Sequence, residues 1–389
     1  RKSSTMNAPH SPSLLSTVEM APRAPILGLT EAYNADKNPK KVNLGVGVYT
    51  GDDGKVPLLD CVSRAERKLM EQPAARNYLP IDGLAAYDKA VQALVFGADS
   101  PALKEGRILT VQTLGGTGGL RVGADFLHRT APNAALWISD PSWENHRAVF
   151  ESAGFKVNTY AYYDAKTRGV DFDGMLAALK AIPAGDIVLL HACCHNPTGV
   201  DLSEAQWASV AETMLARGLV PFLDIAYQGF GDSIEADGIA VRLFAQSGMP
   251  LLVASSFSKS FSLYGERVGS LNVVAGTSDE AARVLSQIKR LVRSNYSNPP
   301  THGSKIVATV LADAELRTLW VQELGQMRDR IKSMRKLLVE KIHARVPGAD
   351  YSYITQQRGM FSYSGLTKEQ VVRMREEFAV YAIESGRIC

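Results

Sequence analysis

Short apolar runs alternate with amphipathic stretches through the middle of the chain, and this pattern constrains the fold more than any other feature. Strands are predicted at residues 107–112, 135–139, 187–191, 219–224, 251–255 and 270–274. Helical patterns lie between them, as in residues 204–217, where Trp207, Val210 and Met214 share one face. Strands that alternate with helices favour an α/β fold around a mostly parallel sheet.

The C-terminal part of the chain has a different pattern, which predicts a second and smaller domain. An amphipathic stretch over residues 316–346 shows no strand signal and ends at a Pro-Gly pair. Strand-like pieces follow at residues 351–354 and 360–363, and then a helix over residues 367–381. We therefore predict a small α+β domain with an N-terminal arm from residues 1–57, a large domain at 58–327, and the remainder of the small domain at 328–389.

Charge and composition narrow the class of partner. The chain carries 43 basic and 40 acidic residues, a net charge of +3, which is too balanced for a nucleic-acid or anionic-membrane protein. No apolar run is long enough to cross a bilayer, and residues 1–20 lack the apolar core of a secretory signal. The four cysteines show no disulfide spacing. We therefore expect a cytoplasmic protein whose natural start is Met6.

Polar side chains follow three of the predicted strands at the point where each strand ends. Asn196 follows the strand at residues 187–191, Asp224 ends the next strand, with Tyr227 just beyond it, and Lys259 follows the strand at 251–255. The carboxyl ends of parallel strands form the ligand crevice of an open α/β sheet. We therefore expect these side chains to meet in one site.

Lys259 has neighbours that give it a chemical role. A lone lysine after a strand is usually a solvated surface cation. Here Ser256, Ser258, Ser260 and Arg267 surround the amine with hydroxyls and one guanidinium, which suits a phosphate group. A partly desolvated lysine beside another cation has a lowered pKa, which favours the free amine that condenses with a carbonyl.

The other polar residues suit a pyridine-based cofactor, and each also has a plainer structural interpretation. Asp224 either caps the following helix or keeps a pyridine nitrogen protonated, so that the ring accepts electrons from a carbanion. Tyr227 and Asn196 can hydrogen-bond a phenolic oxygen on such a ring. Trp143 either stacks on a flat cofactor or belongs to the core. His146 either orients Asp224 or is an ordinary core histidine.

Two further motifs remain ambiguous from the sequence alone. The glycine-rich run at residues 113–119 precedes a helix, where backbone N–H groups can bind phosphate, but it equally suits a simple turn. It matches neither the dinucleotide fingerprint nor the P-loop. The run of Cys193, Cys194 and His195 hints at a metal ion, but no second ligand group lies nearby in the sequence. Buried thiols are favoured there, and no metal site is predicted.

Taken together, these segments resemble the class I aspartate and aromatic aminotransferases. The resemblance covers nearly the whole chain from about residue 18 onward, in the family's order. It rests on the segments around Tyr78, Asp164, Asn196, Asp224, Lys259, Arg267, Tyr296 and Phe361.

The resemblance implies pyridoxal 5′-phosphate as cofactor and the fold type I of enzymes that use it, with a seven-stranded, mostly parallel sheet in the large domain. Lys259 would hold the cofactor as a Schiff base and carry the proton between the substrate Cα and the cofactor C4′. Asp224 would pair with the pyridine nitrogen, and Tyr227 and Asn196 with the phenolic oxygen. The phosphate would be bound by Gly116, Thr117, Ser256, Ser258, Arg267 and, from the other subunit of a homodimer, Tyr78.

The resemblance also implies the reaction, which is transfer of an amino group between an amino acid and a 2-oxo acid. Arg387 would bind the substrate α-carboxylate, and Arg293 of the neighbouring subunit would bind a distal carboxylate. Gly47 would lie in a segment that closes over the substrate, beside Trp143 and Asn196. We expect activity on both aspartate and aromatic amino acids with 2-oxoglutarate; the alternative is a dedicated aspartate aminotransferase. The family continues beyond Cys389 into a closing helix, so we expect further residues there.

Three other functions share part of this pattern. A pyridoxal-phosphate enzyme catalysing β-elimination, decarboxylation or racemisation would retain Lys259 and Asp224, but two carboxylate-binding arginines disfavour it. A nucleotide-binding dehydrogenase would need the dinucleotide fingerprint that the chain lacks. A non-catalytic binding protein would not need Lys259, Asp224, Tyr227, Arg267 and Arg387 together.

Overall fold

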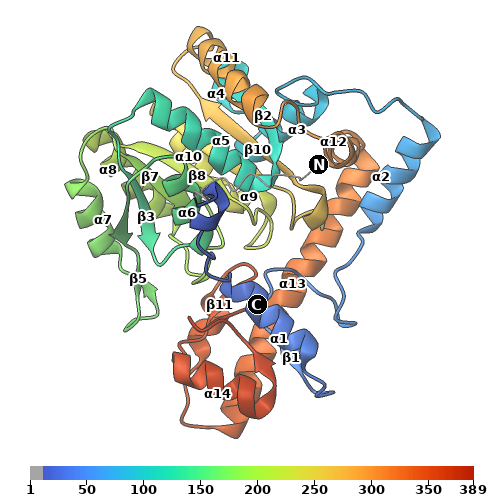
Figure 1. The fold of residues 1–389 in the computed structure, drawn as a ribbon, viewed down its shortest axis with the longest axis vertical. Coiled ribbons are helices and arrows are strands. Elements are labelled where there is room, and N and C mark those ends of the chain that lie inside the picture. Colours follow the sequence, from blue (N-terminus) through green and yellow to red (C-terminus); the bar gives the residue numbers. More distant parts are fainter. Residues whose placement is uncertain (1–11) are drawn as a thin grey trace, which may run out of the picture.

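A seven-stranded sheet forms the centre of the computed structural model, which describes residues 12–389 (Figure 1). The expected start at Met6 lies outside the described residues. Only β10 is antiparallel to its neighbours, and the other strands run parallel to one another. The predicted fold class, a mostly parallel sheet with helices, is therefore confirmed. The strand order is β2 (Ile108–Leu114), β10 (Val268–Val274), β9 (Leu251–Ser256), β8 (Val220–Ile225), β7 (Ile187–His191), β3 (Leu136–Asp140) and β4 (Val157–Ala161).

Helices cover both faces of this sheet, which explains why its strands are apolar almost throughout. Successive residues of one strand point to opposite faces, so Phe222 packs in one core cluster and Leu223 in the other. The first cluster includes α5 (Gly115–Thr130), α6 (Glu144–Ser152) and α11 (Ser278–Asn295). The second includes α3 (Ala85–Phe96), α7 (Phe172–Ala181), α8 (Glu204–Arg217), α10 (Ile239–Gln246) and α12 (His302–Ala312).

A smaller group of elements joins the two ends of the chain (Figure 1). β1 (Val42–Asn43) pairs in parallel with β12 (Val380–Tyr381), and β11 (Ser362–Tyr363) pairs antiparallel with β13 (Arg387–Ile388). α1 (Pro25–Ala35) contacts β1, and α14 (Lys368–Phe378) contacts β12. These contacts bring the first and last parts of the chain together, while the predicted domain boundaries at residues 57 and 327 stay a prediction.

The long helix α13 (Ala314–Arg345) connects the sheet region with this smaller group. Near its start, the Trp320 indole donates a hydrogen bond of 2.8 Å to the Ser260 carbonyl. Farther along, the buried Arg335 guanidinium donates to the carbonyls of Gly359 and Phe361 and to the Ser362 hydroxyl. One rigid helix therefore fixes Ser260, next to Lys259, relative to the strands that carry the C-terminus.

Three sequence-based expectations differ from the structure. The edge strand β4 was not predicted, because only Val157 and Tyr160 of its five residues are buried and it lacks a continuous apolar run. The strand expected at residues 351–354 is wrong: a 3₁₀ turn, η3 (Ser352–Gln356), begins there because Asp350 accepts hydrogen bonds from Ser352. The helix expected to reach residue 381 ends at Phe378, since the residues beyond pair with β1.

The remaining helices and strands are short, apart from the amphipathic helix α2 (Asp60–Glu71). No helix in the described part of the chain is long and apolar enough to span a bilayer. The other elements not yet described are η1 (Leu14–Thr17), α4 (Pro101–Lys104), β5 (Tyr163–Asp164), β6 (Gly169–Val170), α9 (Ile234–Asp237) and η2 (Tyr264–Glu266).

Candidate active site

A cavity of about 250 Å³ lies where the carboxyl ends of β7, β8 and β9 meet the N-terminus of α5. This is the edge at which ligands bind in open α/β sheets. Most residues singled out from the sequence line it, although they come from distant parts of the chain. They are Gly47, Gly116, Thr117, Trp143, Asn196, Asp224, Tyr227, Ser256, Ser258, Lys259 and Arg267.

Lys259 lies three residues beyond the end of β9, with its Nζ 4.9 Å from the centre of the Tyr227 ring. Burial lowers the pKa of this amine; the carboxylate of Asp224 opposes the change and the guanidinium of Arg267 adds to it. A lowered pKa increases the fraction of unprotonated amine at neutral pH. Lys259 is thus suited to act as a nucleophile toward a carbonyl and as a base.

Asp224, near the end of β8, is a buried carboxylate that remains charged. Burial acts to raise its pKa, but the hydrogen bond from His146 and the nearby amine of Lys259 help to outweigh burial and lower it. The Asp224 Oδ2 lies 2.7 Å from His146 Nε2, and His146 Nδ1 lies 2.9 Å from the Ser142 hydroxyl. Because a carboxylate only accepts, Nε2 carries the proton and donates it. His146 thereby orients Asp224 and leaves its Oδ1 for a ligand.

Sequence reasoning missed His191, the last residue of β7. Its ring lies 4.9 Å from that of His146 and lines the cavity, and its Nε2 is buried without a hydrogen-bond partner in the described structure. Burial and the nearby His146 lower the pKa of His191 to about 3, so the ring is neutral at physiological pH. Strand register was the missing information, because β7 and β8 pair with His191 directly opposite Asp224.

The glycine-rich run does more than form a turn, because α5 begins at Gly115 and its N-terminus faces the cavity. Gly115 has φ of +69°, and a Cβ atom there would lie 2.5 Å from Arg267 Nη2. Only glycine therefore permits this close approach. The Arg267 Nη1 lies 3.5 Å from the Ser258 hydroxyl and donates to the Tyr264 carbonyl at 2.9 Å. A guanidinium, hydroxyls and a helix N-terminus together suit a phosphate group.

Arg387 reaches the same site from the opposite end of the chain. Its Nη1 donates to Asn196 Oδ1 at 3.2 Å and its Nη2 to the Gly45 carbonyl at 3.1 Å. The guanidinium also lies 4.3 Å from the centre of the Phe361 ring. The buried Nε has no hydrogen-bond partner among the described residues, although Arg387 is only 6% exposed. Such an unpaired donor suits an incoming carboxylate.

Two of the sequence-predicted residues lie away from the cavity of this chain. The Tyr78 side chain is 84% exposed, and Arg293 is exposed in the last turn of α11, where it hydrogen-bonds Ser297. Both were assigned to the site of a neighbouring subunit. Their roles remain predictions.

The donors and acceptors of the cavity match the groups of pyridoxal phosphate. Arg267, the serines and the start of α5 suit its phosphate, and the carboxylate of Asp224 suits a protonated ring nitrogen. The amine of Lys259 suits its aldehyde carbon.

Comparison with known proteins identifies the family. A model described as aminotransferase class I and II matches residues 39–389. The chain is 60% identical to an aspartate aminotransferase of Pseudomonas aeruginosa over 377 residues, 97% of this chain and 95% of that protein. It is 53% identical to an aromatic-amino-acid aminotransferase of Escherichia coli K12, covering 94% of this chain and 92% of that protein.

Solved structures agree with the sequence comparison. The crystal structure of an aromatic-amino-acid aminotransferase from Burkholderia pseudomallei, covalently bound to pyridoxal phosphate, matches with a TM-score of 0.96 and 65% identity. The match covers 97% of this chain and 94% of that chain. With the cavity described above, these findings show that the chain belongs to the class I and II aminotransferase family and is a pyridoxal-phosphate-dependent transaminase.

Proposed function

We propose that this transaminase moves an amino group from aspartate or an aromatic amino acid to 2-oxoglutarate, and that its active sites are shared between two subunits. The observation that carries the proposal is that Lys259 and Asp224 line one cavity, with Arg387 hydrogen-bonded to Asn196, which lines it too. Relatives named for aspartate and for aromatic substrates both match at 53% identity or more over nearly the whole chain. This range supports dual specificity over a dedicated aspartate enzyme.

The bound cofactor supplies an electron sink that stabilises negative charge at the substrate Cα. In the proposed mechanism, Arg387 binds the α-carboxylate through its unpaired Nε–H, which orients the Cα–H bond toward Lys259. The lysine amine would take the Cα proton and deliver it to the cofactor, and in the reverse direction it would return a proton to Cα, as its lowered pKa allows. Asp224, fixed by His146, holds a proton on the ring nitrogen.

Asn196 links substrate binding to cofactor binding in this proposal. Its Oδ1 accepts from Arg387, so its amide NH₂ would be the group that donates to the phenolic oxygen of the cofactor. Trp143 lines the same cavity and lies edge-on to His146, with the ring centres 5.2 Å apart. Its indole would cover the cofactor ring and exclude water from the site.

Substrate range depends on Arg293 of the neighbouring subunit, which we assign to a distal carboxylate. Replacing it with leucine is expected to lower kcat/KM for aspartate by roughly tenfold to a few hundredfold, because a charge-assisted pair contributes about 1.5–3 kcal/mol. Phenylalanine has no distal carboxylate, so kcat/KM for phenylalanine is expected to fall little. Steady-state kinetics of both donors with 2-oxoglutarate measures the difference.

The matched control is Arg290→Leu, since Arg290 is also an exposed arginine of α11. This variant is expected to have unchanged kcat/KM for both aspartate and phenylalanine. Equal losses on aspartate and phenylalanine in Arg293→Leu would show that Arg293 is structural. An unmodified protein without activity on phenylalanine and tyrosine would instead be a dedicated aspartate aminotransferase.

Sharing of sites between subunits can be tested by complementation. Lys259→Ala and Arg293→Ala subunits are each expected to be poorly active on aspartate. In a mixed dimer one site carries both defects and the other carries neither, so an equal mixture is expected to recover about a quarter of normal activity. Activity after verified subunit exchange is the measurement.

The control mixture combines Lys259→Ala with Asp224→Ala. Both residues lie in the cavity of their own chain, so every site of this mixed dimer keeps one defect and no recovery is expected. If the first mixture also fails to recover, Arg293 does not act across a subunit boundary.

A further inference from the structure

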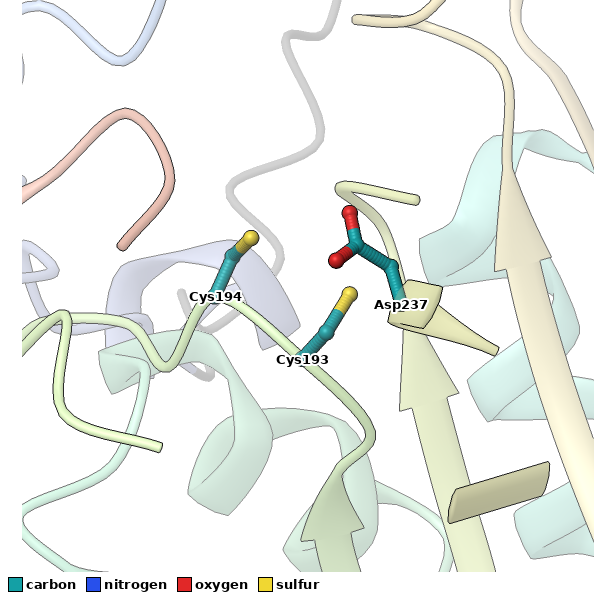
Figure 2. A group of neighbouring side chains, drawn as sticks. All are labelled: Cys193, Cys194 and Asp237. Atoms are coloured by element: carbon teal, nitrogen blue, oxygen red, sulfur yellow. The ribbon is translucent and has the colours of Figure 1, made fainter. Parts of the chain in front are cut away.

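Cys193, Cys194 and Asp237 form a buried cluster beside the active site. Their two Sγ atoms and a carboxylate oxygen lie within 4.8 Å of one another, and Figure 2 shows these groups facing a common space. In the sequence, no further group of metal-ligating residues lies near the two cysteines. The fold supplies one, because the cysteines follow β7 and α9, which ends at Asp237, follows the adjacent strand β8. We propose that this cluster binds one soft divalent cation, such as Zn²⁺ or Cd²⁺.

The spacing of the three ligand atoms is close to that of a metal site. Zinc binds sulfur at about 2.3 Å and carboxylate oxygen at about 2.0–2.2 Å, which separates tetrahedral ligands by roughly 3.5–3.8 Å. Atoms already within 4.8 Å of one another therefore need to move by only about 1 Å. Three protein ligands leave the fourth position for water.

Asp237 has a free acceptor position and a fixed orientation. Its Oδ2 accepts backbone N–H groups from Gly229 at 2.8 Å and Gly231 at 2.9 Å, and its Oδ1 accepts that of Asp232 at 3.0 Å. A carboxylate has about four lone-pair positions, so one remains on Oδ1. Hydrogen bonds of this kind hold a ligand in place for a metal.

The two thiols are weakly bonded in the free protein. Cys194 Sγ lies 3.7 Å from the Tyr227 carbonyl. A hydrogen bond with Cys194, followed by burial, raises the pKa of the Cys193 thiol, which is therefore protonated at neutral pH. Binding of a cation would release both thiol protons to solvent, leaving two thiolates and a carboxylate around M²⁺. Thiolates select soft cations over Mg²⁺ and Ca²⁺.

His195 does not complete this cluster. Its Nε2 lies 2.9 Å from the Ser139 hydroxyl and its Nδ1 lies 2.7 Å from the Thr198 hydroxyl, so both ring nitrogens are already bonded. The Ser139 hydroxyl donates to the Pro141 carbonyl, and it therefore accepts from His195.

An ion can reach the cluster through a second cavity of about 270 Å³, which Cys193 and Asp237 line. The exposed Glu204 and the carboxylate of Asp201 also line this cavity. These acidic groups favour a cation, whereas Arg242 and Arg358, which line the same cavity, and the buried Arg335 near Cys194 oppose it; Arg358 also pairs with Asp201 at 3.8 Å. A thiolate pair must therefore supply most of the affinity.

Cys193 also lines the active-site cavity, so an ion at the cluster would affect catalysis. Asn196 follows on the same short segment and accepts the hydrogen bond of Arg387, and the Tyr227 carbonyl accepts a weak hydrogen bond from Cys194 Sγ. Drawing the ligands together by about 1 Å shifts the backbone that positions these groups. A bound ion is therefore expected to inhibit the enzyme. The expected inhibition rests on the proposed function, whereas the expected binding of the ion does not.

The test is titration of the assembled, cofactor-loaded protein with Cd²⁺. The ultraviolet charge-transfer band of cadmium thiolates is expected to saturate at one ion per chain, and activity is expected to fall with the same midpoint. A chelator should reverse both. X-ray absorption of the Zn²⁺-loaded protein should show two sulfur ligands, a readout that needs no variant and no activity.

Cys193→Ser and Cys194→Ser are each expected to weaken Cd²⁺ binding by about a hundredfold or more. Cys61→Ser, which changes another fully buried thiol in α2, should leave the band and the midpoint unchanged. Each variant is compared with its own metal-free activity, and its cofactor absorbance verifies folding. A band that never saturates, that persists in Cys193→Ser or that Cys61→Ser abolishes would overturn the site. Stoichiometric binding without inhibition would overturn only its coupling to catalysis.

Discussion

Replacing Lys259 with alanine is expected to lower kcat by about ten-thousandfold, the upper end of what a positioned acid–base group contributes. The amine is the group in the cavity that combines a lowered pKa with reach to a bound carbonyl. Cofactor binding should persist, because Arg267, Ser256 and Ser258 remain. Steady-state kinetics and cofactor absorbance measure the two effects separately.

Borohydride treatment identifies the attachment site independently. Reduction of the unmodified protein is expected to fix the cofactor on the peptide that contains Lys259, as mass spectrometry can show. Lys180→Ala, which removes an exposed lysine at the end of α7, should change neither labelling nor kcat. Covalent label on a different lysine would refute the assignment.

Replacing Asp224 with alanine is expected to lower kcat by about a hundredfold to a thousandfold, as the loss of one preorganised electrostatic group does. The carboxylate is charged in spite of its burial, because His146 donates to it and Lys259 lies nearby. Without it the ring nitrogen loses its proton, and the electron sink weakens. Cofactor affinity is expected to fall less than kcat, because the phosphate contacts remain.

Asp173→Ala is a suitable control, since Asp173 is an exposed carboxylate in the first turn of α7. The cofactor absorbance of Asp224→Ala should shift toward that of an unprotonated ring, an effect that a folding defect does not produce. Nearly normal kcat in Asp224→Ala would show that the carboxylate does not serve the ring nitrogen.

The sequence by itself determined the sheet and the main part of the candidate site, because both depend on short-range patterns. Six of the seven strands were predicted, since buried parallel strands are continuous apolar runs bounded by polar residues. Asn196, Asp224 and Lys259 end or follow such runs, and parallel strands necessarily place those ends at one edge. The roles came from the resemblance to the aminotransferases.

Only the tertiary structure decided the contacts that depend on register or on distant segments. Strand register places His191 opposite Asp224, and no local pattern encodes it. Pairing of β13 with β11 brings Arg387 to Asn196, 191 residues away in the chain. In the same way, the order of β7 and β8 brings Asp237 to the two cysteines and forms a cluster that the sequence disfavoured. Such contacts arise from packing of the whole chain, which is why local sequence could not predict them.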